Sequence, residues 1–148
     1  GNLSTYVYKE LGGKLQLAVW DFNNGFDNFQ DSVKSTDILH TVKNSWIERL
    51  WQDKNFRDCV CERYVQLRKT TLSDEHIAEK IASYQEELGD AVDRNFKVWG
   101  YSFDENLLVG TGKDGMSRDI GSYEEAMKQL TDTIRERLAY LDKELGGN

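Results

Sequence analysis

One stretch of the sequence brings together residue types that can do chemistry, and it reads LQLAVWDFNNGFDN from Leu15 to Asn28. It begins as an apolar, strand-like run and then presents Asp21 between two aromatic residues, Trp20 and Phe22. A carboxylate at the mouth of a strand offers the hard oxygen ligands that Mg²⁺ prefers. The same residue type also caps turns. Spacing alone supports a metal ligand and a turn cap equally.

Further oxygen ligands follow in the same loop, but their pattern favours a plain polar turn. They are Asn23, Asn24, Asp27 and Asn28. Short polar side chains of this kind bond to the local backbone and form turns. The loop also lacks the Glu at the twelfth position that an EF-hand requires. The metal prediction therefore rests on Asp21.

Other candidate sites are weaker. The run GTGKDG from Gly110 to Gly115 lacks the order of a phosphate-binding loop and no strand-to-helix junction frames it, so a connection or short hairpin is predicted there. Cys59 and Cys61 point in different directions on a helix and have no nearby metal ligands, which predicts free thiols, one buried and one partly exposed. His40 and His76 lack partners for a catalytic triad. No catalytic residue is predicted.

Composition restricts the class of partner. The 148 residues carry 26 acidic and 19 basic side chains, a net charge of −7, and 39% are hydrophobic. This balance argues against nucleic-acid binding, which needs a basic surface. No run approaches the ~20 apolar residues of a membrane span. The composition therefore predicts a folded domain that does not insert into a membrane.

Two short strand-like runs open the chain, Tyr6 to Tyr8 and Leu15 to Val19, and Gly12-Gly13 lies between them. A Gly-Gly step supplies the positive φ angles of tight turns, so a β-hairpin is predicted. Two strands alone are marginally stable in water. The hairpin should therefore need support from helices or from strands outside this chain.

Helical periodicity begins after a long loop that ends near Lys43. The first predicted helix runs from Asn44 or Ser45 to Trp51, and the second is capped by Asp53 and ends at Arg68-Lys69. The third runs from Ser73 to Trp99, about six turns. The fourth runs from Ser122, which forms a capping box with Glu125, to Gly146. The predicted class is α+β, mostly α, with an N-terminal hairpin and about four helices, the last two long and antiparallel. A single domain fragment spans 1–148, with the hairpin and W-D-F loop in 1–43 and the helical part in 44–148.

The order of these pieces resembles the CotH family of spore-coat-protein-H-like atypical kinases, which are bacterial, secreted or cell-surface proteins. The resemblance covers most of the chain but only the C-terminal part of the family's domain. The residues that carry it are Ser4 to Lys9, Gly12 to Leu15, Val19 to Asn24, Trp46 to Leu50, Asp53 to Phe56, Glu62 to Tyr64, Leu72-Ser73, Arg94 to Phe96, Trp99 and Arg137 to Asp142.

This resemblance implies a diverged kinase fold that transfers phosphate from ATP to a protein substrate. Asp21 would be the Mg²⁺ ligand, as in the kinase D-F-G motif, with Trp20 and Phe22 beside the bound ATP and Mg²⁺. The ATP-gripping Lys and the catalytic Asp would lie upstream of Gly1, so this fragment alone should be inactive. An extracellular or cell-surface location is implied by the same resemblance.

The chain departs from the family pattern at two positions. Ala18 stands where the family often has Pro, and Asp27 stands where it often has Gly. The second departure adds a carboxylate that could join the metal site or alter the turn. An alternative function is therefore a non-catalytic surface binding or structural module with a degenerate kinase site. An upstream Lys in an early strand and an Asp shortly before Asn2 would favour the enzyme.

Overall fold

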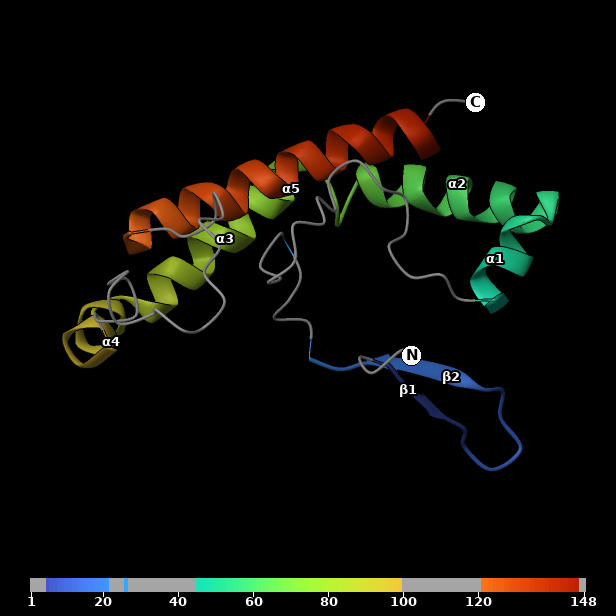
Figure 1. Ribbon diagram of the computed structural model, residues 1–148, viewed down its shortest axis with the longest axis horizontal. Helices are drawn as coiled ribbons and strands as arrows, with labels where there is room; N and C mark the ends of the chain where they lie inside the picture. Colours follow the sequence, from blue (N-terminus) through green and yellow to red (C-terminus); the bar gives the residue numbers. More distant parts are fainter. Residues whose placement is uncertain (1–4, 22–25, 27–44, 100–120, 147–148) are drawn as a thin grey trace.

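The computed structural model describes residues 5–21, 26, 45–99 and 121–146. These residues form a two-stranded hairpin and five helices (Figure 1). The elements are β1 (Thr5–Tyr8), β2 (Gln16–Val19), α1 (Ser45–Trp51), α2 (Lys54–Arg68), α3 (Asp74–Leu88), α4 (Ala91–Trp99) and α5 (Tyr123–Leu145). The predicted class, α+β and mostly α, is confirmed.

The hairpin forms where the Gly12-Gly13 step predicted it. β1 and β2 pair antiparallel, with Thr5 opposite Val19. In the connecting turn Gly12 has a φ of 76°, and the N–H of Gly13 donates to the carbonyl of Glu10 at 2.9 Å. Glycine enters this left-handed region without steric cost, which lets the chain reverse here.

Both faces of the hairpin are exposed in the described structure. Val7, Leu17 and Val19 are exposed on one face, and Tyr6 and Trp20 on the other. In Figure 1 the hairpin projects away from the layer of helices. The described helices therefore leave uncovered an apolar sheet that is marginal by itself.

The helices begin at the predicted caps. Side-chain oxygens of Asp53, Ser73 and Ser122 accept hydrogen bonds from backbone N–H groups in the first turns of α2, α3 and α5. The carboxylate of Glu125 also accepts from the N–H of Gly121 at 2.7 Å. These contacts satisfy N–H groups that have no partner inside the helix. The three predicted helix starts are confirmed.

The prediction of one six-turn helix from Ser73 to Trp99 is wrong. The chain forms α3 and α4, separated by Gly89, which has φ 43° and ψ −131°. This conformation lies outside the helical region and is open mainly to glycine. Apolar periodicity continues across the break, as Leu88 and Val92 illustrate, and this is why the pattern alone concealed it.

The last helix, α5, connects both ends of the helical layer. At its start Tyr123 contacts Phe96 of α4, with ring centroids 5.9 Å apart. Near its end Asp142 bonds to Tyr64 of α2. α5 therefore runs antiparallel to the path from α2 to α4, as Figure 1 also shows. The buried residues of the described chain lie on α2 and α5 and are Tyr64, Thr133, Leu138 and Leu145.

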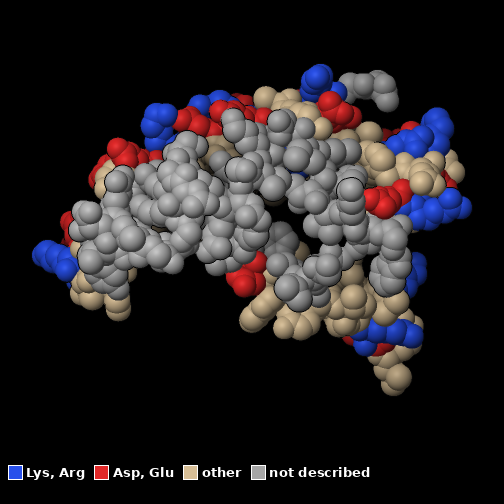
Figure 2. All heavy atoms as spheres, viewed as in Figure 1, with Lys and Arg blue, Asp and Glu red and all other residues tan. Residues whose placement is uncertain are grey.

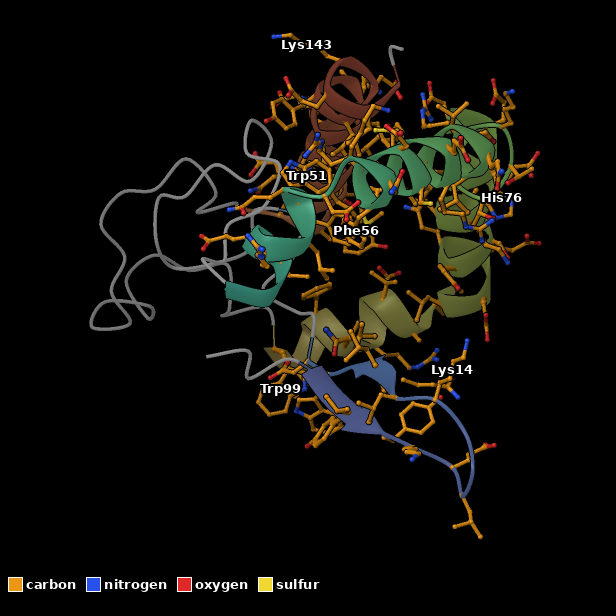
Figure 3. All side chains as sticks on the ribbon, turned by 90° about the vertical axis from the view of Figure 1, so that its right-hand side faces the viewer. Lys14, Trp51, Phe56, His76, Trp99 and Lys143 are labelled. Atoms are coloured by element: carbon orange, nitrogen blue, oxygen red, sulfur yellow. The ribbon has the colours of Figure 1, made fainter. Side chains whose placement is uncertain are left out.

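A second, smaller contact joins α1 to α2. The rings of Trp51 and Phe56 meet edge to face with centroids 6.3 Å apart, and both lie at this corner in Figure 3. The guanidinium of Arg57 donates to the carbonyl of Trp51 at 2.5 Å. The aromatic pair and this C-terminal hydrogen bond set the angle at which α1 enters α2.

Charged side chains of both signs cover the visible helical surface, whereas much of the hairpin is uncharged (Figure 2). Among the described helices, none is long and apolar enough to cross a membrane.

Candidate functional site

The hairpin places Asp21 at an exposed position just beyond a strand. β2 ends at Val19, and Asp21 follows one residue after Trp20. The backbone of Asp21 adopts a φ of 54°, in the left-handed region. Asp and Asn tolerate this region better than other side chains that have a Cβ, but it still carries a cost and is often found at functional positions. The carboxylate is thus presented at the surface by an unusual backbone turn.

Trp20 rests against Tyr6 on one face of the hairpin. The ring centroids are 5.7 Å apart and the planes meet at 81°, an edge-to-face contact. Tyr6 pairs with Ala18, so its ring lies diagonally across the strands from Trp20. The two side chains remain 56% and 57% exposed. The residue directly before Asp21 is thus held in an aromatic pair whose two side chains are more than half exposed.

Several other candidate residues that the sequence singled out are not described by the structure. Phe22 lies outside the described residues, as do the loop residues Asn23, Asn24, Asp27 and Asn28 and the run from Gly110 to Gly115. Within the described ranges, no group of three or more His, Cys, Asp and Glu side chains could hold a metal ion. A single exposed carboxylate fits one Mg²⁺ ligand, so Asp21 would be one member of a larger oxygen shell.

Among the described residues, neither the two cysteines nor His76 belongs to a group that could hold a metal ion. Cys59 and Cys61 are free, as predicted, but the prediction that one is buried is wrong, because Cys59 is exposed and Cys61 is half-buried. The short turn before α3 leaves His76 partly exposed, with its backbone N–H bonded to Ser73. His40 lies outside the described residues.

A groove between α2 and the end of α5 has a volume of about 720 Å³. Its lining residues are Lys54, Asp58, Cys61, Glu62, Val65, Gln66, Leu145 and Gly146. Lys54 is the one cation of this lining, and its ammonium is already paired with Asp58 at 2.6 Å. A nucleotide phosphate would meet the carboxylates of Asp58 and Glu62 without a free counter-charge. The groove therefore does not fit ATP.

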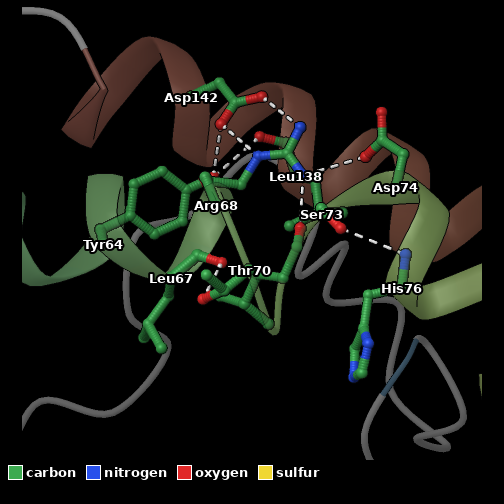
Figure 4. Close-up of polar contacts among 10 residues, drawn as sticks. Tyr64, Leu67, Arg68, Thr70, Ser73, Asp74, His76, Leu138 and Asp142 are labelled. Atoms are coloured by element: carbon green, nitrogen blue, oxygen red, sulfur yellow. Dashed lines mark hydrogen bonds and ion pairs between the residues drawn. The ribbon is translucent and has the colours of Figure 1, made fainter.

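The most strongly coupled charged groups of the described chain lie away from Asp21, where α2, α3 and α5 meet (Figure 4). The guanidinium of Arg68 donates to both carboxylate oxygens of Asp142, with N–O distances of 2.9 and 3.1 Å. The hydroxyl of Tyr64 donates to the same carboxylate at 2.7 Å. This bidentate Arg–carboxylate pair is stronger and more directional than a contact through a single hydrogen bond.

Arg68 also binds the chain between α2 and α3. Its remaining N–H groups donate to the carbonyl of Leu72 and, at 2.9 Å, to the carboxylate of Asp74. One guanidinium thus holds three helices, because Asp74 begins α3 and Asp142 belongs to α5. We call Tyr64, Arg68, Asp74 and Asp142 the helix clasp.

The pKa shifts of the helix clasp follow from this geometry. Burial, reinforced by the bond to Asp142, raises the pKa of Tyr64. The bond to Asp142 raises the pKa of Arg68, although burial opposes the increase. Burial disfavours the charge on Asp142, but hydrogen bonds from Arg68 and Tyr64 outweigh it and hold the pKa of Asp142 below its usual value. Tyr64, Arg68 and Asp142 therefore each keep the protonation state that is usual at neutral pH, which suits a structural contact rather than proton transfer.

The sequence did not predict the helix clasp. Tyr64 fitted an apolar stripe, Arg68 fitted the negative end of a helix, and Asp142 lay 74 residues beyond Arg68. Each had a sufficient local explanation, so no signal in the sequence pointed to their contact. The predicted packing paired the last two helices with each other, whereas Arg68 lies at the end of α2 and Asp142 in α5.

Acid should weaken the helix clasp through Asp142. Since the pKa of Asp142 in the fold lies below its unfolded value of about 3.8, its stabilising effect is fully present above that pH. The effect is lost as the pH falls through the lower, folded pKa. Urea unfolding of wild type and Asp142→Asn should therefore differ in free energy at pH 6 and converge below pH 3.8. A gap of constant size over this range would contradict the assignment.

Comparison with known proteins agrees with the order of these elements. The family model described as CotH kinase protein matches residues 2–141, which is nearly the whole chain and includes the hairpin, Asp21, α1 to α4 and α5 up to residue 141. Neither the curated proteins nor the solved structures that were compared gave a match. By the extent of the family match, the chain belongs to the CotH kinase protein family.

Proposed function

We propose that this chain is the helical C-terminal part of a CotH-like protein kinase and that Asp21 is its Mg²⁺ ligand. The observation that carries the proposal is the presentation of Asp21, an exposed carboxylate with a left-handed backbone directly after β2, within the family match. Its substrates are ATP and a protein hydroxyl. An extracellular or cell-surface location is part of the same proposal.

Asp21 would act by holding positive charge against the phosphates. Bound Mg²⁺ supplies charge neutralisation as the γ-phosphate is transferred. Asp21 provides an oxygen ligand of the hard type that this ion prefers, and we assign the exposed ring of Trp20, the preceding residue, to the ATP-binding surface. Phe22 completes the proposed contacts with the bound ATP and Mg²⁺.

The proposal assigns no catalytic base to this chain. Phosphoryl transfer depends mainly on positioning and charge neutralisation, so it needs the whole set of groups around the phosphates. Asp21 supplies one of them. We therefore expect the 148-residue chain alone to transfer no phosphate to a protein substrate.

Mn²⁺ titration of the full-length protein in the presence of ATP tests the metal assignment. Electron paramagnetic resonance measures free and bound Mn²⁺ directly. We expect Asp21→Ala to remove a bound ion, because the ion loses its carboxylate ligand. Asp93→Ala, which removes an exposed carboxylate from α4, is the matched control and should bind as wild type does. Equal binding by Asp21→Ala and wild type would refute the assignment.

The second candidate is a surface binding or structural module with a degenerate kinase site. The exposed aromatic face of the hairpin favours it, because exposed apolar patches often mark contacts with other proteins. A full-length protein that folds but binds neither Mn²⁺ nor ATP would support this candidate over the kinase.

A further inference from the structure

Trp20 and Asp21 are consecutive, so the conformation of one constrains the other. Asp21 takes a left-handed φ of 54°, and a rotation of the peptide between the two residues would turn the Cα–Cβ bond of Asp21 and move its carboxylate. An exposed residue in a sparsely populated conformation persists only when its surroundings hold it there. A contact that restrains Trp20 therefore also restrains the turn at Asp21.

Tyr6 is the aromatic partner that the described chain offers Trp20. The two rings meet edge to face at 5.7 Å, an arrangement that places the positive ring edge against the negative ring face. Tyr6 is held in turn by the strand pairing, because it lies opposite Ala18 in the ladder. Ala18, the residue opposite Tyr6, carries only a methyl group as its side chain.

We propose that Tyr6 is a positioning residue of the Asp21 site. Its contact with Trp20 restricts the peptide that precedes Asp21 and keeps the carboxylate in the direction that a metal ion requires. This inference rests on the proposed function, since it assumes that Asp21 binds the ion. Tyr6 itself does not touch the ion or the phosphates.

Tyr8 provides a matched comparison on the same strand and the same face. Its hydroxyl donates to the side chain of Gln16 at 2.9 Å, at the end of the strand pair remote from Trp20. Loss of Tyr8 removes a similar amount of aromatic surface from the hairpin but leaves the pair of Tyr6 and Trp20 in place. A general weakening of the hairpin would therefore affect both variants alike.

The test measures Mn²⁺ affinity of the full-length protein with ATP present, by electron paramagnetic resonance. We expect Tyr6→Ala to weaken binding about two- to tenfold, the range that corresponds to the loss of one aromatic pair. Tyr6→Phe keeps the ring and should bind within about twofold of wild type. Tyr8→Ala should bind as wild type does. Tyr6→Leu keeps a large apolar residue in the strand but removes the aromatic ring, so it should also weaken binding about two- to tenfold. This variant decides the test if Tyr6→Ala does not fold.

The outcomes separate the inference from the proposed function. If Asp21→Ala abolishes binding but Tyr6→Leu binds as tightly as wild type, Asp21 remains the ligand and the role of Tyr6 is overturned. An equal loss in Tyr6→Leu and Tyr8→Ala overturns it as well, because the effect is then a general one of the hairpin. If Asp21→Ala leaves binding unchanged, the proposed function and this inference both fail.

Discussion

Asp21→Asn should lower the rate of phosphate transfer to a protein substrate by about 10³-fold or more in the full-length protein. Asn has nearly the same shape as Asp and enters the left-handed region readily, so the φ of 54° at this position can be retained. What changes is the charge of one proposed metal ligand. A loss of rate without a loss of fold would therefore report on the metal site itself.

The assay follows transfer of radiolabelled phosphate from ATP to protein in the presence of Mg²⁺. Asp93→Asn makes the same change of charge at an exposed helical position and should retain the wild-type rate. Circular dichroism of all three proteins should show equal helix content. A rate for Asp21→Asn within tenfold of wild type would show that the site does not depend on this carboxylate.

Arg68→Ala should have the largest effect on stability, a loss of about 2–3 kcal/mol. The Arg68 side chain is 21% exposed and bonds to Asp142, Asp74 and the carbonyl of Leu72. Removing one partner of a buried ion pair costs about 3–5 kcal/mol. Water reaches Asp142, whose side chain is 43% exposed, and this reduces the cost.

Urea unfolding followed by circular dichroism measures this loss, with Arg135→Ala as the control. Arg135 pairs with Asp132 at a similar distance of 2.9 Å, but on the exposed surface of α5. Water screens such an exposed pair, so it contributes little to stability. A double-mutant cycle of Arg68→Ala with Asp142→Ala should show a favourable coupling energy. Equal losses in Arg68→Ala and Arg135→Ala would mean that the helix clasp does not hold the helices together.

Local features of the fold could be predicted because they depend on neighbouring residues. Gly12 reverses the hairpin through its own φ angle, and Ser73 begins a helix by binding an N–H only three residues away. The break at Gly89 was missed because one glycine within an apolar stripe is compatible with a continuous helix. Its backbone angles, rather than its neighbours' periodicity, divide α3 from α4.

The sequence by itself determined that Asp21 follows a strand. It also determined that the chain resembles the CotH family, which the comparison confirms. It also indicated which faces of the helices are apolar. Only the tertiary structure decided that Tyr64, Arg68 and Asp142 meet. Asp142 lies 74 or more positions from its two partners, and local sequence patterns do not show contacts at that separation. It likewise joined Tyr6 to Trp20 through the register of two strands. Side-chain periodicity assigns a residue to a face, but packing selects its partner.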